Sequence, residues 1–141
     1  MSLYLDTCIL VPLFIPEAYS EDLSIWIGET GRTLCLSDIA VAEFHAVVSR
    51  LVRKRLIDDI RADAIRAKFE SWLTASAELV ENIPVDIRAA GRLVRIPFPR
   101  LLTADATHLA TCQRREMTLV TTDRDLQVVA GREGVSWVSP A

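Results

Sequence analysis

Short apolar runs alternate along the chain with longer amphipathic segments. The runs are rich in aliphatic and β-branched side chains, which is typical of buried strands. They lie at 3–5, 33–37, within 77–83, at 117–123 and at 135–138. The longer segments carry apolar residues at helical spacing and predict helices at 37–56, 60–75, 85–96, 103–116 and 124–134.

Capping residues and prolines mark several of the predicted helix ends. Ser37 or Asp38 is a natural N-cap for the first long helix, and Thr103 for a later one. The helix of 85–96 is expected to stop before the prolines that follow it. Pro12 is expected to shorten or kink the helix after the first strand, because proline lacks a backbone N–H donor.

The alternation of strands and helices predicts an α/β fold. We expect a central parallel sheet of about four to five strands flanked by helices in three layers. The chain has 141 residues, half of them hydrophobic and a quarter charged, which suits one domain over 1–141 with a real core. The composition argues against disorder.

Neither a targeting signal nor a membrane span is expected. The longest apolar run, 8–16, is interrupted by Pro12 and is too short to cross a bilayer. Cys8, Cys35 and Cys112 lie far apart in apolar surroundings and form no CxxC pair. Buried free thiols are typical of a reducing compartment, so a cytoplasmic location is expected.

Acidic residues occur where an ionised carboxylate is costly. Asp6 ends the first strand between apolar stretches, and Asp123 ends the strand at 117–123 in the same way, with Asp125 two residues on. Glu43 lies in a helical row with apolar residues, and Asp105 is in the first turn of its helix.

A parallel sheet can bring these acids to one edge, because ligands bind beyond the carboxyl ends of its strands. Four carboxylates in one cleft repel each other unless a cation is present, and hard oxygen ligands select Mg²⁺ or Mn²⁺. Taken singly, the aspartates also suit helix caps, and for Asp125 an N-cap role and a fifth acidic contact remain equal alternatives.

The sequence resembles the PIN-domain ribonucleases, and among them the VapC-type toxins of toxin–antitoxin pairs. The segments that carry the resemblance are "YLDTCILV", "LSDIAVAEF", "LLTADATHLAT" and "LVTTDRDL". The family's catalytic and metal-binding acids fall on Asp6, Glu43, Asp105 and Asp123. Thr7 and Thr122 match supporting positions, and Thr122 matches the hydroxyl or amide that helps to hold the cluster. Cys8 stands where many relatives have Ser or Asn.

This resemblance implies hydrolysis of RNA phosphodiesters by a metal-activated water, with no side-chain nucleophile. It also implies a homodimer and a cognate antitoxin that lays an apolar segment into a groove and directs a basic residue into the acidic site. The apolar surplus at 8–16 and around Trp26, with Ile25, predicts that this groove is bordered by the first two helices. His108 lies one turn from Asp105, where we expect a hydrogen-bonded packing residue.

Two alternatives remain open at the level of sequence. A haloacid-dehalogenase-type phosphatase also begins from an Asp after the first strand, but its second Asp is replaced here by Cys8. A catalytically silent PIN-like interaction module is the other. The net charge of −3 does not by itself suggest an RNA binder, but excluding the four site acids leaves 15 of the 19 acidic residues against 16 basic ones.

Overall fold

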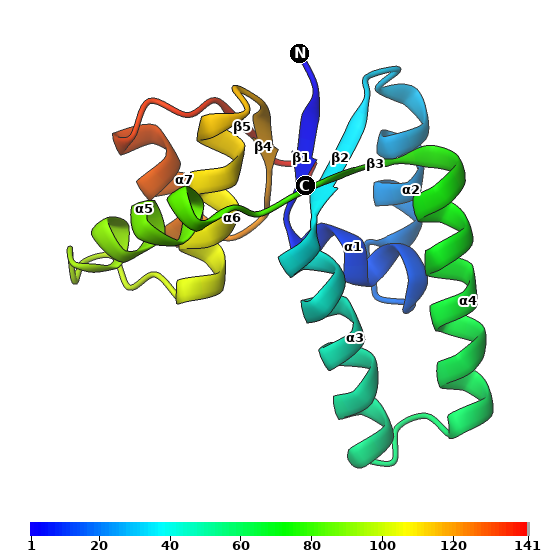
Figure 1. Ribbon diagram of the computed structural model, residues 1–141. Coiled ribbons are helices and arrows are strands. Elements are labelled where there is room, and N and C mark those ends of the chain that lie inside the picture. The colour runs from blue at the N-terminus through cyan, green and yellow to red at the C-terminus, as the bar shows by residue number, and fades with distance from the viewer. Residues whose placement is uncertain (141) are drawn as a thin grey trace.

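The computed structural model describes residues 1–140, which form a five-stranded parallel sheet between two layers of helices (Figure 1). The elements in chain order are β1 (Leu3–Leu5), α1 (Thr7–Phe14), α2 (Ser20–Glu29), β2 (Leu34–Ser37), α3 (Asp38–Arg53), α4 (Asp59–Ser76), β3 (Glu78–Val80), α5 (Pro84–Val94), α6 (Thr103–Arg114), β4 (Thr118–Val120), α7 (Arg124–Arg132) and β5 (Trp137–Val138). The predicted α/β class is confirmed.

The sheet has the strand order β3-β2-β1-β4-β5, with β1 in the centre. From β1 the chain moves outward through β2 to β3, and then returns to place β4 on the other side of β1. The strand order therefore changes direction between β1 and β4. In parallel sheets such a change opens a crevice at the carboxyl ends of the strands, where ligands bind.

Successive residues of the central strand face opposite helical layers, because side chains alternate along a strand. Leu3 and Leu5 pack in a core with α1, α2, α3 and α4, whereas Tyr4 packs in a second core with α5, α6 and α7. Both faces of the sheet are thus covered, as expected for an all-parallel sheet.

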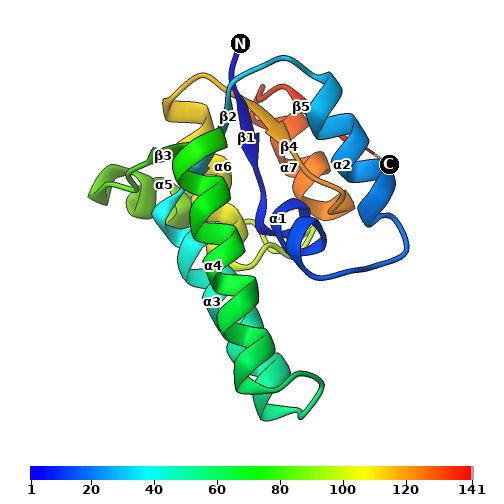
Figure 2. The same cartoon turned by 90° about the vertical axis from the view of Figure 1, so that its right-hand side faces the viewer.

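The α3 and α4 helices run side by side as an antiparallel pair that extends beyond the sheet (Figures 1 and 2). Asp58 caps α4 by accepting a hydrogen bond of 2.7 Å from the Arg61 N–H. Arg55, in the connection, has a positive φ of 59°. The hairpin projects the basic end of α3 away from the sheet.

Some helix ends differ from the sequence prediction. The α3 helix begins at Asp38 with Ser37 as its N-cap, but the Ser37 side chain makes no capping hydrogen bond. Its hydroxyl instead lies 2.5 Å from the Tyr4 hydroxyl. The N-cap of α6 is Leu102 rather than Thr103. Pro12 lies inside α1, a helix of only eight residues.

Within residues 1–140, no helix is both long and apolar enough to span a membrane. The three cysteines are free; Cys35 and Cys112 are buried, whereas Cys8 is only partly buried.

Candidate active site

Two of the predicted site acids follow the neighbouring strands β1 and β4 at the carboxyl edge of the sheet. Asp6 comes directly after β1 and its backbone N–H donates to the Val120 carbonyl of β4 (3.1 Å). Asp123 comes shortly after β4 and is the N-cap of α7. Glu43 enters from α3 and Asp105 from the first turn of α6. Four separate elements therefore supply the four acids.

Asp6 is 3% exposed, and neighbouring side chains hold one of its carboxylate oxygens. The Thr121 hydroxyl donates to Asp6 Oδ2 over 2.8 Å, and the Cys8 thiol donates to the same oxygen over 3.1 Å. Thr121 also accepts a hydrogen bond from the Asp123 N–H (3.1 Å). Thr121 thus links the acids that follow β1 and β4.

The hydroxyl that holds Asp6 belongs to Thr121, the residue before the predicted Thr122. The Thr122 hydroxyl donates to Cys8 Sγ at 3.5 Å, whereas the Thr121 hydroxyl contacts Asp6 itself. The two residues are adjacent threonines after the same strand, so the sequence pattern offers no basis for choosing between them. Burial raises the pKa of the Cys8 thiol to about 12, and the neighbouring Asp6 charge adds to this effect, so Cys8 is a neutral donor.

Glu43 is held by the Thr7 hydroxyl and the His108 ring. Thr7 Oγ1 donates to Glu43 Oε1 over 2.8 Å, and His108 Nε2 lies 2.5 Å from the same oxygen. Burial alone would raise the pKa of the Glu43 carboxyl. The hydrogen bond and charge of His108, with the hydrogen bond from Thr7, outweigh burial and leave that pKa below its ordinary value.

His108 lies beneath the acids and is fully buried. Its Nδ1 atom is 2.6 Å from the Tyr4 hydroxyl, and its Nε2 atom is 3.8 Å from Asp6 Oδ1. Burial lowers the pKa of His108, but the hydrogen bond that His108 donates to Glu43 and the charges of Asp6, Glu43 and Asp105 outweigh burial, so the pKa is raised. The buried imidazole, hydrogen-bonded at both nitrogens, agrees with the expected packing role.

Asp105 shows that the four carboxylates share one electrostatic environment. Its pKa is raised to about 6, first because it is partly buried and then because of the negative charges of Asp6 and Asp123. His108 opposes this effect and Glu43 adds to it. The predicted cluster is therefore brought together, with too little positive charge to neutralise it.

Asp123 and Asp125 have different positions at the start of α7. Asp123 Oδ1 accepts hydrogen bonds from the N–H groups of Asp125 (2.9 Å) and Leu126 (3.2 Å), so Asp123 caps the helix. The interpretation of Asp125 as the N-cap is therefore wrong. Asp125 is exposed in the first turn.

The donor chemistry of the cluster fits a divalent cation. The acids offer hard oxygen ligands, and the raised pKa of Asp105 reflects repulsion that a cation would relieve. As the side chains stand, however, no group of three or more His, Cys, Asp or Glu residues within 1–140 is arranged to hold a metal. Glu43 points one oxygen at His108 and Thr7, so ligation requires rearrangement of at least some carboxylates.

The sequence matches the model of the PIN domain over residues 3–132. The chain belongs to the PIN-domain family. PIN-domain nucleases generally use divalent metal ions, in keeping with the acidic cluster. No curated protein matches the sequence.

Solved structures share this PIN fold over nearly their whole length. FitAcB from Neisseria gonorrhoeae is 19% identical with a TM-score of 0.78, covering 98% of this chain and 97% of that one. VapBC2 from Rickettsia felis, bound to a promoter DNA fragment, is 17% identical with a TM-score of 0.72, covering 99% and 98%. VapC20 from Mycobacterium tuberculosis, a Sarcin-Ricin loop cleaving toxin, is 18% identical with a TM-score of 0.71, covering 90% and 94%.

Proposed function

We propose that this PIN domain is a Mg²⁺- or Mn²⁺-dependent endoribonuclease and the VapC-type toxin of a toxin–antitoxin pair. The observation that supports it most is the convergence of Asp6, Glu43, Asp105 and Asp123 from four elements, with the pKa of Asp105 raised by its acidic neighbours. Repulsion among four clustered carboxylates lowers the stability of the fold unless a bound cation offsets it. VapC20, which shares the fold, cleaves an RNA loop.

In this proposal each side chain has a defined task. Asp6, Glu43 and Asp105 would hold the cation or its waters, and Asp123 would complete the site or orient a water. When bound, the cation supplies activation of water and stabilisation of the departing oxygen. His108 keeps Glu43 ionised from beneath, and the Thr7 and Thr121 hydroxyls fix carboxylate oxygens.

A nuclease assay on the purified chain tests this function directly. Labelled RNA should be cut in the presence of Mg²⁺ or Mn²⁺ and left intact in EDTA. A silent interaction module with the same fold would leave the RNA intact under both conditions. Cleavage that survives EDTA would argue against the metal-dependent mechanism.

The partner in this proposal is an antitoxin that occupies a hollow on the α1–α2 side of the molecule. The α1/α2/α4 hollow has a volume of about 320 Å³ and is lined by Leu13, Phe14, Ser24, Ile27, Gly28, Lys68 and Trp72. It supports the groove expected beside the first two helices and adds α4 to its border. An antitoxin Arg that reached the acids would inhibit by displacing the cation.

The proposal also includes a cytoplasmic homodimer. Ile25 on α2 is 51% exposed, and other large apolar side chains also face solvent in the single chain. Light scattering on the purified protein should give twice the mass of one chain. A strictly monomeric mass would remove the dimer from the proposal without affecting the nuclease assignment.

A further inference from the structure

Beside the acidic site, the α3 helix carries a pocket that ends in two arginines. The pocket, of about 290 Å³, lies against Glu43 and is lined by Thr7, Glu43, Ala46, Val47, Arg50 and Arg53. Along α3 the lining residues recur every three or four positions, with Ala46 and Val47 adjacent to each other, so they follow one face of the helix. The pocket therefore leads from a site carboxylate to two guanidinium groups on the same helix face.

Neither guanidinium has a role in holding the fold together. Arg50 and Arg53 are exposed, and within residues 1–140 neither side chain makes a hydrogen bond or an ion pair. Like charges at this spacing on a helix destabilise it slightly. Both groups are thus free to bind an anion from outside the protein.

The helix dipole explains only part of this arrangement. Cations in the last turn of a helix stabilise its carboxyl end, and Arg50 and Arg53 lie in the last turn of α3. Cations on any side of that turn would stabilise the helix dipole equally well. It does not account for two arginines that both line the pocket containing Glu43.

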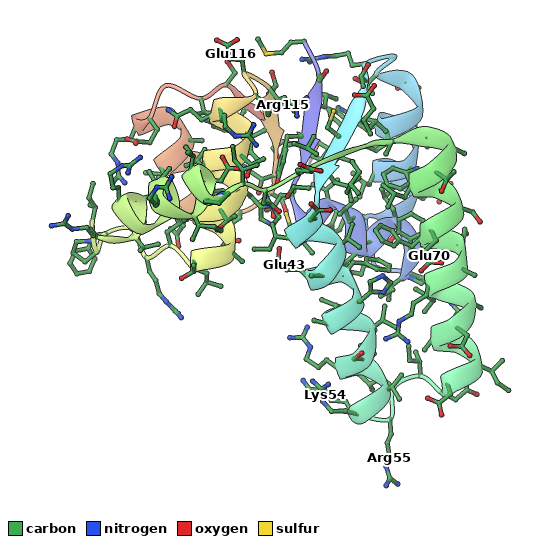
Figure 3. The ribbon with its side chains drawn as sticks, viewed as in Figure 1. Glu43, Lys54, Arg55, Glu70, Arg115 and Glu116 are labelled. Carbon is green, nitrogen blue, oxygen red and sulfur yellow. The ribbon has the colours of Figure 1, made fainter. Side chains whose placement is uncertain are left out.

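We propose that Arg50 and Arg53 form a phosphate track that holds the RNA backbone on one side of the scissile bond. This inference rests on the proposed ribonuclease function. From the helix rise, Arg50 and Arg53 lie about 10 Å and about 15 Å along α3 from Glu43, beyond the reacting phosphate. Figure 3 shows Glu43 at the sheet end of α3 and Lys54 at its far end.

The lining of the pocket also indicates how the RNA is recognised there. Ala46 and Val47 give an apolar floor between the acid and the arginines, and none of the six lining residues is aromatic. Without an aromatic platform there is no base stacking of the kind that single-strand binders use. The two arginines of the track bind the charged phosphates of the RNA backbone and contribute no sequence preference.

RNA binding in EDTA tests the track without requiring cleavage. A fluorescein-labelled oligouridylate is titrated with the wild-type chain, Arg50→Gln and Arg53→Gln, and the anisotropy is followed over a range of salt concentrations. The matched control is Arg115→Gln, which removes an exposed arginine at the opposite end of the molecule (Figure 3). Melting temperatures establish that every variant is folded.

Each track variant should bind about 5-fold more weakly at low salt, and its slope of log affinity against log salt should fall by about 0.7, the value for one single-strand phosphate contact. Arg115→Gln should match the wild type. An uncharged morpholino oligomer of the same sequence should not distinguish the variants. Equal affinities and slopes for all four proteins, or no binding by the wild type, would overturn the track.

The track and the nuclease function can fail separately. If RNA is cleaved and the track variants cleave and bind it as well as the wild type, only the track is wrong. If the chain cleaves no RNA but Arg50→Gln and Arg53→Gln still weaken binding, the track stands as an RNA-binding surface and the proposed nuclease function is wrong.

Discussion

The Nε2 atom of His108 lies 2.5 Å from Oε1 of Glu43, a contact that joins α6 to α3 beneath the acidic site. The other ring nitrogen lies 2.6 Å from the Tyr4 hydroxyl on the central strand. A charged imidazole donates from both nitrogens, so Tyr4 accepts from one side and Glu43 from the other. The sheet therefore positions Glu43 through a buried histidine.

Tyr4→Phe tests whether the Tyr4–His108 contact helps to hold Glu43 in place. The substitution keeps the ring but leaves His108 Nδ1 buried without its partner, and such a loss costs about 1–3 kcal/mol. Urea denaturation should show a lower free energy of unfolding by that amount, and cleavage should be slower because Glu43 is less well held. A variant with the stability and activity of the wild type would show that the contact does not support the site.

The hydrophobic pattern was sufficient to predict the fold class and nearly all of the element order. The strand at Leu3–Leu5 is predictable because it is a continuous apolar run that is buried on both sides, and the helix near 60–75 because its buried residues recur at helical spacing. The pattern does not determine where each helix starts, since a Ser or Thr near a helix end can hydrogen-bond to several different partners. Ser37 shows this, because its hydroxyl contacts Tyr4 instead of the first turn.

The four acids were predicted from their positions in the sequence, but the contacts that organise them were not. Thr121 and Tyr4 act through hydrogen bonds between residues more than 100 positions apart, and no local pattern reports such contacts. The sequence also does not show that Glu43 is already hydrogen-bonded to Thr7 and His108 and would have to move to bind a metal. The sequence suggests which atoms are ligands, whereas the structure shows which of them are already engaged.

Asp6→Asn should abolish cleavage without unfolding the protein. The amide oxygen still accepts from Thr121, and loss of the charge relieves repulsion with Asp105. We expect the cleavage rate to fall more than about 100-fold, because a ligand of the cation is lost. The matched control is Glu70→Gln on the exposed face of α4, which should cleave normally (Figure 3). A much lower melting temperature for Asp6→Asn in EDTA would make Asp6 a structural residue.

Mg²⁺ or Mn²⁺ should stabilise the fold, because a ligand that binds only the native state shifts the unfolding equilibrium. At a concentration about 100 times the dissociation constant the gain is about 2.7 kcal/mol. Thermal melting with increasing metal measures it, and EDTA should reverse it. Glu43→Gln should reduce the gain. A wild-type melting temperature that does not respond to millimolar metal would argue against a cation site.

Asp86, which lies away from the acidic site, should make the stability of the fold depend on pH. Arg114 donates to both of its oxygens (2.8 and 3.0 Å), and the Ile83 N–H donates to one of them (3.0 Å). Burial raises the pKa of Asp86, but these hydrogen bonds and the Arg114 charge outweigh it, so the pKa is lowered. The stability this pair contributes is present above the unfolded pKa of about 4 and is lost as pH falls through the lower folded value.

Asp86→Asn should therefore cost about 2–3 kcal/mol at pH 7, and its difference from the wild type should shrink as the pH is lowered below about 4. Urea denaturation at several pH values measures this. Asp63→Asn, at an exposed position on α4, is the control and should follow the wild type at every pH. A cost for Asp86→Asn that is the same at pH 7 and pH 3 would contradict the assignment.

The proposed antitoxin site can be tested at Gly28. Gly28 lines the α1/α2/α4 hollow, and a side chain added there meets no atom within 4 Å. Gly28→Glu therefore places a charge in the hollow without disturbing the packing beneath it. Gly91 on α5 is an exposed helical glycine with the same open surroundings, so Gly91→Glu is the matched control.

The antitoxin to be tested is the product of a short reading frame next to the gene, co-expressed with each variant. If an apolar antitoxin segment fills the hollow, Gly28→Glu should lose most of the co-purified partner, because burying an unpaired carboxylate is costly. Gly91→Glu should retain it. Both variants should still cleave RNA when purified alone, since neither change touches the acids. Equal recovery of the partner by both variants would place the antitoxin on another face of the molecule.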